Sequence, residues 1–190
     1  MEQLAYDSSI FEKIDYTGKV IKGTEFQSCV FKKCDFSNSI FSNNKFIDCQ
    51  FEDCNLSMMK LTGSALSDAG FKNCKILGVI FSECQDLLFS VRFTSCMLDY
   101  ASFMGKKMVK TSFIKSSLKE VNFTQTNMSG SLFEETDLSG AVFNGTDLSS
   151  ANFVAAYNFV IDPELNNIKK AVFSSDGLPG LLAKYQIEIV

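Results

Sequence analysis

The sequence predicts an all-β solenoid in which short extended segments, joined by corners, stack in one direction. The main observation is a period of five, because a large apolar residue recurs at every fifth position over most of the chain. This period matches neither a helix nor a flat strand. A fixed short period is typical of a solenoid, whose units bury their apolar faces only against their neighbours. The first series contains Phe26, Phe31, Phe36, Phe41, Phe46, Phe51, Leu56, Leu61, Leu66, Phe71, Ile76 and Phe81, and the second contains Leu88, Phe93, Leu98, Phe103, Met108, Phe113, Leu118, Phe123, Met128, Phe133, Leu138, Phe143, Leu148 and Phe153.

Two further observations support this fold. The residue two before each large one is usually small, as at Cys29 and Ser39, and residues two apart in a strand share a face. We therefore expect both residues to point inward. Most of the 11 glycines lie two positions after a large residue, where a corner needs permissive backbone angles. These glycines are Gly18, Gly23, Gly63, Gly78, Gly105, Gly130, Gly140 and Gly145.

The repeated unit resembles that of the pentapeptide repeat family, which reads small residue, Asp or Asn, Leu or Phe, and two polar residues. Close matches are Cys-Asp-Phe at 34–36, Cys-Asn-Leu at 54–56, Ala-Asn-Phe at 151–153, Thr-Asp-Leu-Ser-Gly at 136–140 and Thr-Asp-Leu-Ser-Ser at 146–150. The resemblance implies a right-handed quadrilateral parallel β-helix, with one unit per side and four per coil. About 29 units would make about seven coils, and the rod would be roughly 35 Å long at the spacing of β-strands.

The period divides the single domain into segments. Phe81 and Leu88 are two residues further apart than the repeat allows, so we expect Gln85, Asp86 and Leu87 to bulge outward at this slip. The expected segments are an N-terminal cap at 1–10, a first repeat block at 11–81, the register slip at 82–87, a second block at 88–156, and a C-terminal cap with a dimer element at 157–190.

The composition argues against an enzyme. The chain has no histidine, which is the commonest general base and a frequent metal ligand. No glycine-rich phosphate loop interrupts the repeat. We therefore expect a non-enzymatic protein with no cofactor and no bound metal. No apolar run approaches the roughly 18 residues of a membrane span, and no signal peptide is recognisable, so we expect no membrane association.

The seven cysteines follow the structural period and lack the spacing of metal ligands. Thiols in a chain without a signal peptide favour a reducing compartment, so we expect a cytoplasmic protein. The simplest interpretation is that the cysteines pack as small hydrophobes. A thiol redox role is the alternative, because Cys34, Cys54 and Cys74 would stack on one wall at distances compatible with disulfide formation.

The repeat fades near the C-terminus. Asp162 before Pro163 fits a helix start, and a structured loop is an equal alternative. Further on, apolar residues are spaced as one face of a helix, and Ile187 and Ile189 then alternate with Glu188 as a short strand. We expect this helix-plus-strand cap to pair with a second copy about a twofold axis. The predicted dimer contacts are Leu178, Leu181, Leu182, Tyr185, Ile187 and Ile189.

The ending Leu181-Leu182, followed by Ile187 and Ile189, is similar to that of Qnr-type fluoroquinolone-resistance proteins in the same family. This narrower resemblance implies a DNA mimic that binds DNA gyrase or topoisomerase IV and dimerises through its C-terminal end. The partner would then be a protein, and a type II topoisomerase is the leading hypothesis. Because the pI is acidic, we expect no direct binding of nucleic acid.

The net charge of −4 is unevenly distributed. Residues 61–119 hold 8 basic and 4 acidic groups, whereas residues 120–190 hold 3 basic and 9 acidic groups. A 35 Å mimic of duplex DNA would need about 20 negative charges, so mimicry is confined to the C-terminal third. A continuous negative stripe would favour mimicry, whereas interspersed signs would favour a scaffold for another protein partner. The candidate acidic surface comprises Glu134, Glu135, Asp137 and Asp147.

Overall fold

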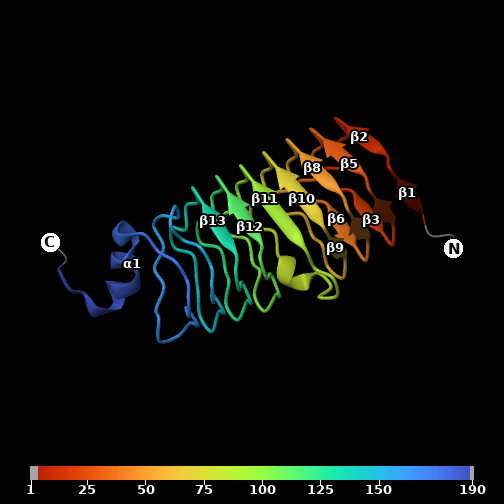
Figure 1. Ribbon diagram of the computed structural model, residues 1–190. Coiled ribbons are helices and arrows are strands. Elements are labelled where there is room, and N and C mark those ends of the chain that lie inside the picture. The colour runs from red at the N-terminus through yellow and green to blue at the C-terminus, as the bar shows by residue number, and fades with distance from the viewer. Residues whose placement is uncertain (1–3, 189–190) are drawn as a thin grey trace.

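The computed structural model describes residues 4–188 as one rod of stacked coils with the two termini at opposite ends (Figure 1). Its four sides are parallel ladders, here called walls A to D. Wall A contains β1 (Ala5–Asp7), β4 (Glu25–Gln27), β7 (Lys45–Ile47) and β9 (Ala65–Ser67). Wall B contains β2 (Ile10–Glu12), β5 (Val30–Lys32), β8 (Gln50–Glu52), β10 (Ala69–Lys72), β11 (Val91–Thr94), β12 (Ser112–Ile114) and β13 (Leu132–Glu134).

The two remaining walls have less regular strand structure. Wall D contains β3 (Val20–Lys22) and β6 (Ile40–Ser42) and continues through isolated parallel bridges. Wall C consists of isolated bridges that begin with Asp15 beside Asp35. The seven strands of wall B come from successive coils and span six turns, so the predicted four-sided parallel solenoid is confirmed. Bridges that reach Asn167 and Val172 carry the ladder past residue 156.

The corners explain the period of five. The eight glycines predicted to lie at corners all have left-handed backbone angles, with φ between 64° and 73°. Non-glycine residues also occupy these corners, and many are Ser, Asn or Asp, such as Asn38 with φ 55°. Short polar side chains tolerate the left-handed region better than bulky ones. Each corner turns the chain by one side, so every fifth side chain returns to the interior.

Two columns of phenylalanine fill most of the core. On wall B the rings of consecutive coils lie parallel, as Phe113 and Phe133 do with centroids 5.3 Å apart. Wall D carries a second column, in which Phe103 lies parallel to Phe123 at 5.6 Å. Rings of the two columns meet edge to face, which is a favoured aromatic geometry. Phenylalanine therefore occupies two opposite walls of the second block.

The small inward position has a hydrogen-bonding role as well as a steric one. The Cys54 thiol donates to the Phe31 carbonyl at 3.3 Å, and Ser64 Oγ donates to the Phe41 carbonyl at 2.7 Å. Thr146 Oγ1 donates to the Phe123 carbonyl at 2.8 Å. A buried carbonyl without a partner is costly, which explains why Cys, Ser, Thr and Asn recur where small size alone would favour alanine.

The first coil begins inside the segment expected to form an N-terminal cap. β1 pairs with β4 in parallel, which places Tyr6 beside Phe26. Their rings lie parallel with centroids 5.4 Å apart. Residues 5–10 therefore already belong to the solenoid.

The C-terminal end carries the predicted helical cap, but not the predicted strand. Three short turns follow one another: η2 (Ser175–Gly177), α1 (Pro179–Leu182) and η3 (Ala183–Tyr185). Residues 186–188 form no strand, because Gln186 adopts a left-handed conformation with φ 51° and no neighbouring strand pairs with Ile187. Ile189 lies outside the described residues. At Asp162, the alternative of a structured loop is correct, and its carboxylate accepts a hydrogen bond from the Glu164 amide at 2.9 Å.

Candidate binding surfaces

The four predicted acidic residues do not form one surface. Glu134 ends β13 on wall B, and Glu135 occupies the next corner. Asp137 lies on wall C, where it bridges to Ser117. Asp147 lies on wall A beside Asn127, on the opposite side of the rod from Asp137. The structure therefore groups the first three around one corner and separates the fourth.

Asp137 is less accessible than we expected, because only 14% of its side chain is exposed. Its carboxylate accepts hydrogen bonds from Ser139 Oγ at 2.6 Å and Asn158 Nδ2 at 2.9 Å. Partial burial alone would raise the pKa of Asp137, but these bonds hold the pKa below its usual value. Asp137 is therefore a charged structural group with little surface to offer a partner.

Opposite charges alternate between neighbouring coils. Lys32 lies 3.6 Å from Glu52 on wall B, and Lys45 lies 3.0 Å from Glu25 on wall A. The acidic corner follows the same rule, since Lys115 lies 3.7 Å from Glu135. Lys119 likewise lies 3.4 Å from Asp137. Stacking in register brings such pairs together. The signs along these walls are therefore interspersed, which is the pattern that favours a scaffold.

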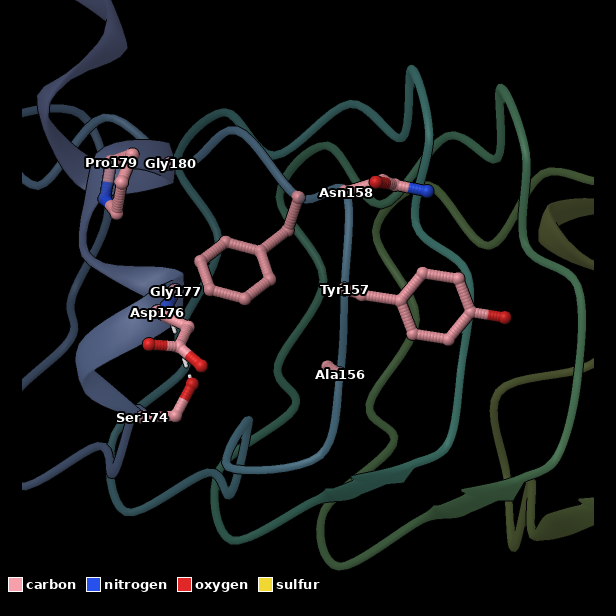
Figure 2. Close-up of a pocket in the computed structure, with 9 residues that line it drawn as sticks. Ala156, Tyr157, Asn158, Ser174, Asp176, Gly177, Pro179 and Gly180 are labelled. Atoms are coloured by element: carbon pink, nitrogen blue, oxygen red, sulfur yellow. Dashed lines mark hydrogen bonds between the residues drawn. The ribbon is translucent and has the colours of Figure 1, made fainter.

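The C-terminal cap depends on close packing against Phe159. A hollow of about 320 Å³ lies between the last coil and the cap, and Figure 2 shows Tyr157 and Asn158 directed away from the helix side. Gly177 and Gly180 face the Phe159 ring, where a Cβ at Gly180 would lie 2.9 Å from ring atom Cδ2. The Ile161 amide donates to the Gly180 carbonyl at 3.0 Å. This contact needs residues without side chains at the two glycine positions.

A second set of contacts fixes the far end of the cap. Lys184 Nζ lies 2.7 Å from both Asp162 and Glu164. Hydrogen bonds to these two carboxylates hold the pKa of Lys184 above its usual value. Tyr185 donates its hydroxyl to Glu164 at 3.0 Å. The cap is thus tied to the last coil on two sides.

The six predicted dimer contacts have different environments. Leu181 packs against the core cluster, so its main contact is within the chain. Ile189 lies outside the described residues. The remaining four side chains are exposed at the end of the rod: Leu178, Leu182, Tyr185 and Ile187.

The register slip forms the expected outward bulge, but Leu88 does not resume the series. Leu88 is exposed, and Phe89 occupies the buried position, with its ring 6.4 Å from that of Phe81. The extra length is taken up by η1 (Phe81–Glu83) and by a loop at residues 85–88. The five-residue count missed this shift because leucine and phenylalanine are adjacent and both satisfy an apolar pattern.

Lys106 was an exception to the small-residue rule in the sequence, and the structure explains it. Its side chain is only 2% exposed, and its Nζ donates to the Cys84 carbonyl and to Asp86 Oδ1, both at 2.5 Å. The amine also lies 5.3 Å from the centroid of the Phe89 ring. Lys106 therefore anchors the base of the bulge. In the sequence, this anchoring role is indicated by a charged residue at a position expected to point inward, one coil after the slip.

The thiols occupy buried positions in the rod. All seven cysteines lie within the described residues, and all are buried and unpaired. Burial raises the pKa of Cys49 to about 12, so its thiol stays protonated and weakly reactive. Within residues 4–188, no cluster of acidic residues and cysteines could hold a metal ion. None of the helices in this range has the length and apolar character needed to cross a membrane.

Comparisons with solved structures support the fold. A trypsin-treated form of QnrB1, a plasmid-mediated fluoroquinolone resistance protein, is 18% identical, with 100% of each chain covered and a TM-score of 0.58. A second trypsin-treated form is 19% identical, with 99% of this chain and 98% of that chain covered and a TM-score of 0.57. HetL, from the cyanobacterium Nostoc sp. strain PCC 7120, is 12% identical, with coverage of 92% and 90% and a TM-score of 0.33. The likeness to the two QnrB1 structures concerns the fold alone at these identities, and the HetL match carries no argument at its TM-score.

Family models identify the repeat itself. A model of the pentapeptide repeat region matches residues 24–103, and a model of pentapeptide repeats matches residues 116–153. No curated protein matches the sequence. The matched segments cover more than half of the chain and contain most of the stacked coils described above, and the chain therefore belongs to the pentapeptide repeat family.

Proposed function

We propose that this protein acts by binding other proteins, and that it forms a homodimer through its C-terminal end. The observation that carries this proposal is the set of four exposed apolar side chains, Leu178, Leu182, Tyr185 and Ile187, on a cap that is firmly tied to the rod. Leu181 already covers the core, so these four exceed what capping one coil requires. Apolar surface on a rigid support is typical of protein interfaces.

The dimer is tested by removing this apolar surface without uncovering the core. We expect the intact chain to have the mass of two copies in light scattering, and the double variant Leu178→Ser, Leu182→Ser to have the mass of one. The matched control is Val20→Ser, which removes an exposed apolar side chain from the first coil. Deletion of residues 175–190 is a poorer test, because it would also uncover Phe159, which packs against Gly177 and Gly180. A single-chain mass for the intact protein would contradict the dimer.

A second, more specific proposal is that the partner is a type II topoisomerase. It is supported by the excess of acidic groups in residues 120–190 and by the Qnr-like ending of the sequence. The excess of negative charge is confined to the C-terminal third of the rod, so this third would contact the topoisomerase. The contacts would be with basic residues of the topoisomerase that normally hold DNA phosphates. Such contacts are mainly electrostatic and weaken as salt rises.

Glu134 provides the sharpest test of this proposal. We expect purified protein to inhibit supercoiling by gyrase, or to relieve its inhibition by a fluoroquinolone, more strongly at low ionic strength than at high. Glu134→Lys should weaken this effect, whereas Glu12→Lys should leave it unchanged. Both glutamates are exposed and end a strand of the same wall. Glu12 pairs with Lys32 and Glu134 pairs with Ile114, so a melting curve of each variant checks that folding is intact. Asp137 is unsuitable because its carboxylate holds local structure. No effect on gyrase or topoisomerase IV would leave the scaffold as the proposed class.

A further inference from the structure

The bulge at residues 85–88 exposes more apolar surface than any requirement of the fold explains. Leu87 is 77% exposed and Leu88 is 72% exposed, although both belong to a loop that interrupts the core series. Val109, on the next coil of wall A, is also exposed. These three side chains help to line a shallow hollow of about 380 Å³. A hollow that combines exposed apolar side chains with polar groups is a common feature of binding sites.

The bulge is held in place on several sides. Lys106 anchors the Cys84 carbonyl and the Asp86 carboxylate from inside the rod. Gln85 Nε2 donates to the Gly63 carbonyl at 2.8 Å, which ties the loop to the preceding coil. After the loop, Ser90 Oγ donates to Asp68 Oδ1 at 2.9 Å. The loop that carries the two leucines is therefore already ordered, so its conformational entropy falls little when a partner binds.

The backbone at Leu88 has an unfavourable conformation for leucine. Its φ is 59°, in the left-handed region that bulky side chains rarely adopt. Glycine and short polar residues fill most other corners, but Met58, Tyr100 and several lysines also adopt this conformation. An exposed leucine contributes no core packing that would offset the unfavourable angle. Leu88 therefore meets the backbone requirement of the corner with a side chain that adds nothing to the core.

The charges beside the bulge indicate what it would bind. Lys107 lines the hollow, and Lys110 is exposed at the following corner. The charge of Asp86 is matched by Lys106, and Asp68 accepts the hydrogen bond from Ser90. Lys107 and Lys110 thus favour a negatively charged ligand next to the leucines.

We propose that Leu87, Leu88, Val109 and Lys107 form a docking site for an acidic protein segment that carries a bulky apolar side chain. The apolar side chain enters the hollow, and carboxylates of the same segment pair with the lysines. This inference rests on the proposed protein-binding function and places one of its contacts in the middle of the rod. The site is separate from the C-terminal cap, so the two can be tested independently.

The probe is a phage-displayed library of random short peptides, selected on the full-length chain. We expect the enriched peptides to combine Asp or Glu with Leu, Phe or Trp. The affinity of a synthetic enriched peptide should fall at least about tenfold for Leu87→Ser and for Lys107→Glu. Ile10→Ser, which changes an exposed side chain of the first coil, should bind the peptide as the unmodified chain does. Enriched peptides that are basic, or that bind Leu87→Ser with unchanged affinity, would overturn the proposal.

Leu88→Asn separates binding from folding. Asparagine adopts the left-handed region more readily than leucine, so the melting temperature should stay the same or rise while peptide affinity falls. A fall in melting temperature would instead indicate that Leu88 is structural and would contradict the proposal.

Other occupants of the hollow give different results. Loss of the two-chain mass in Leu87→Ser would assign the bulge to a second copy, and Leu87-dependent flotation with phosphatidylglycerol vesicles would assign it to a membrane surface. Both results would overturn the docking site. Peptides whose binding depends on Leu178 and Leu182 would overturn it too, but would leave the proposed protein-binding function standing.

Discussion

Replacement of Phe123 by alanine should lower the free energy of unfolding by about 3–5 kcal/mol. The Phe123 ring is fully buried and lies parallel to those of Phe103 at 5.6 Å and Phe143 at 5.3 Å. It also meets Phe113 edge to face at 5.9 Å. The backbone ladder holds the coils above and below in register, so they cannot move together to fill the cavity that the missing ring leaves. The loss of stability is measured from the midpoints of denaturant unfolding curves that have equal slopes in the two proteins.

Thr124 supplies the matched control, because it follows Phe123 directly and lies on the outer side of the coil. Its backbone amide donates to Asn122 Oδ1 at 2.9 Å, and this bond survives replacement of the side chain. Thr124→Ala should therefore change the midpoint very little. If both variants gave the same small effect, the five-residue assignment of inward and outward positions would be wrong in this region.

Gly180→Ala should detach the C-terminal cap and cost about 1–3 kcal/mol of local stability. A methyl group at this position would overlap the Phe159 carbonyl oxygen, which is backbone and cannot rotate away. Relief requires the helix to move outward, which breaks the hydrogen bond from the Ile161 amide to the Gly180 carbonyl. We expect faster amide hydrogen exchange at Ile161 and across 178–185, with the central coils unchanged.

The control is Pro179→Ala, which changes an adjacent exposed side chain and should leave exchange at Ile161 as it was. Slow exchange at Ile161 in Gly180→Ala would show that the cap tolerates the extra methyl group and that its position does not depend on Gly180. Since the proposed dimer surface lies on the same cap, Gly180→Ala should also reduce the two-chain mass. The effect on exchange can be read whether or not the chain dimerises.

The sequence predicted the buried positions correctly wherever the local backbone alone decides which side chain points inward. Each large residue of the series faces the interior because the corner after it has a left-handed backbone, as at Gly63 and Asn43. The glycine corners and the two phenylalanine columns could therefore be predicted by counting. Counting failed at Leu88, because the choice between Leu88 and Phe89 depends on how Lys106, one coil later, holds the bulge.

The surface was harder to predict, because neighbours on a wall are a whole coil apart in sequence. Asp137 is acidic in the sequence, but its exposure is set by Asn158 and Lys119, each contributed by another coil. At the cap, helical structure was predicted correctly, but the four apolar residues do not share one face, because Leu181 points inward whereas Leu178 and Leu182 point outward. The structure separates them because Phe159 and the two glycines fix how the cap sits on the last coil.

The sequence alone determined that this chain is a pentapeptide repeat solenoid with a phenylalanine core, because each unit repeats the same local choice of inward, outward and corner residues. Only the tertiary structure decided how the exceptions are accommodated: which leucines are presented by the bulge, which carboxylates are paired, and which face of the cap is free. These features depend on contacts between coils and with the cap. A periodic pattern carries no information about such contacts, because it describes each unit by its own residues.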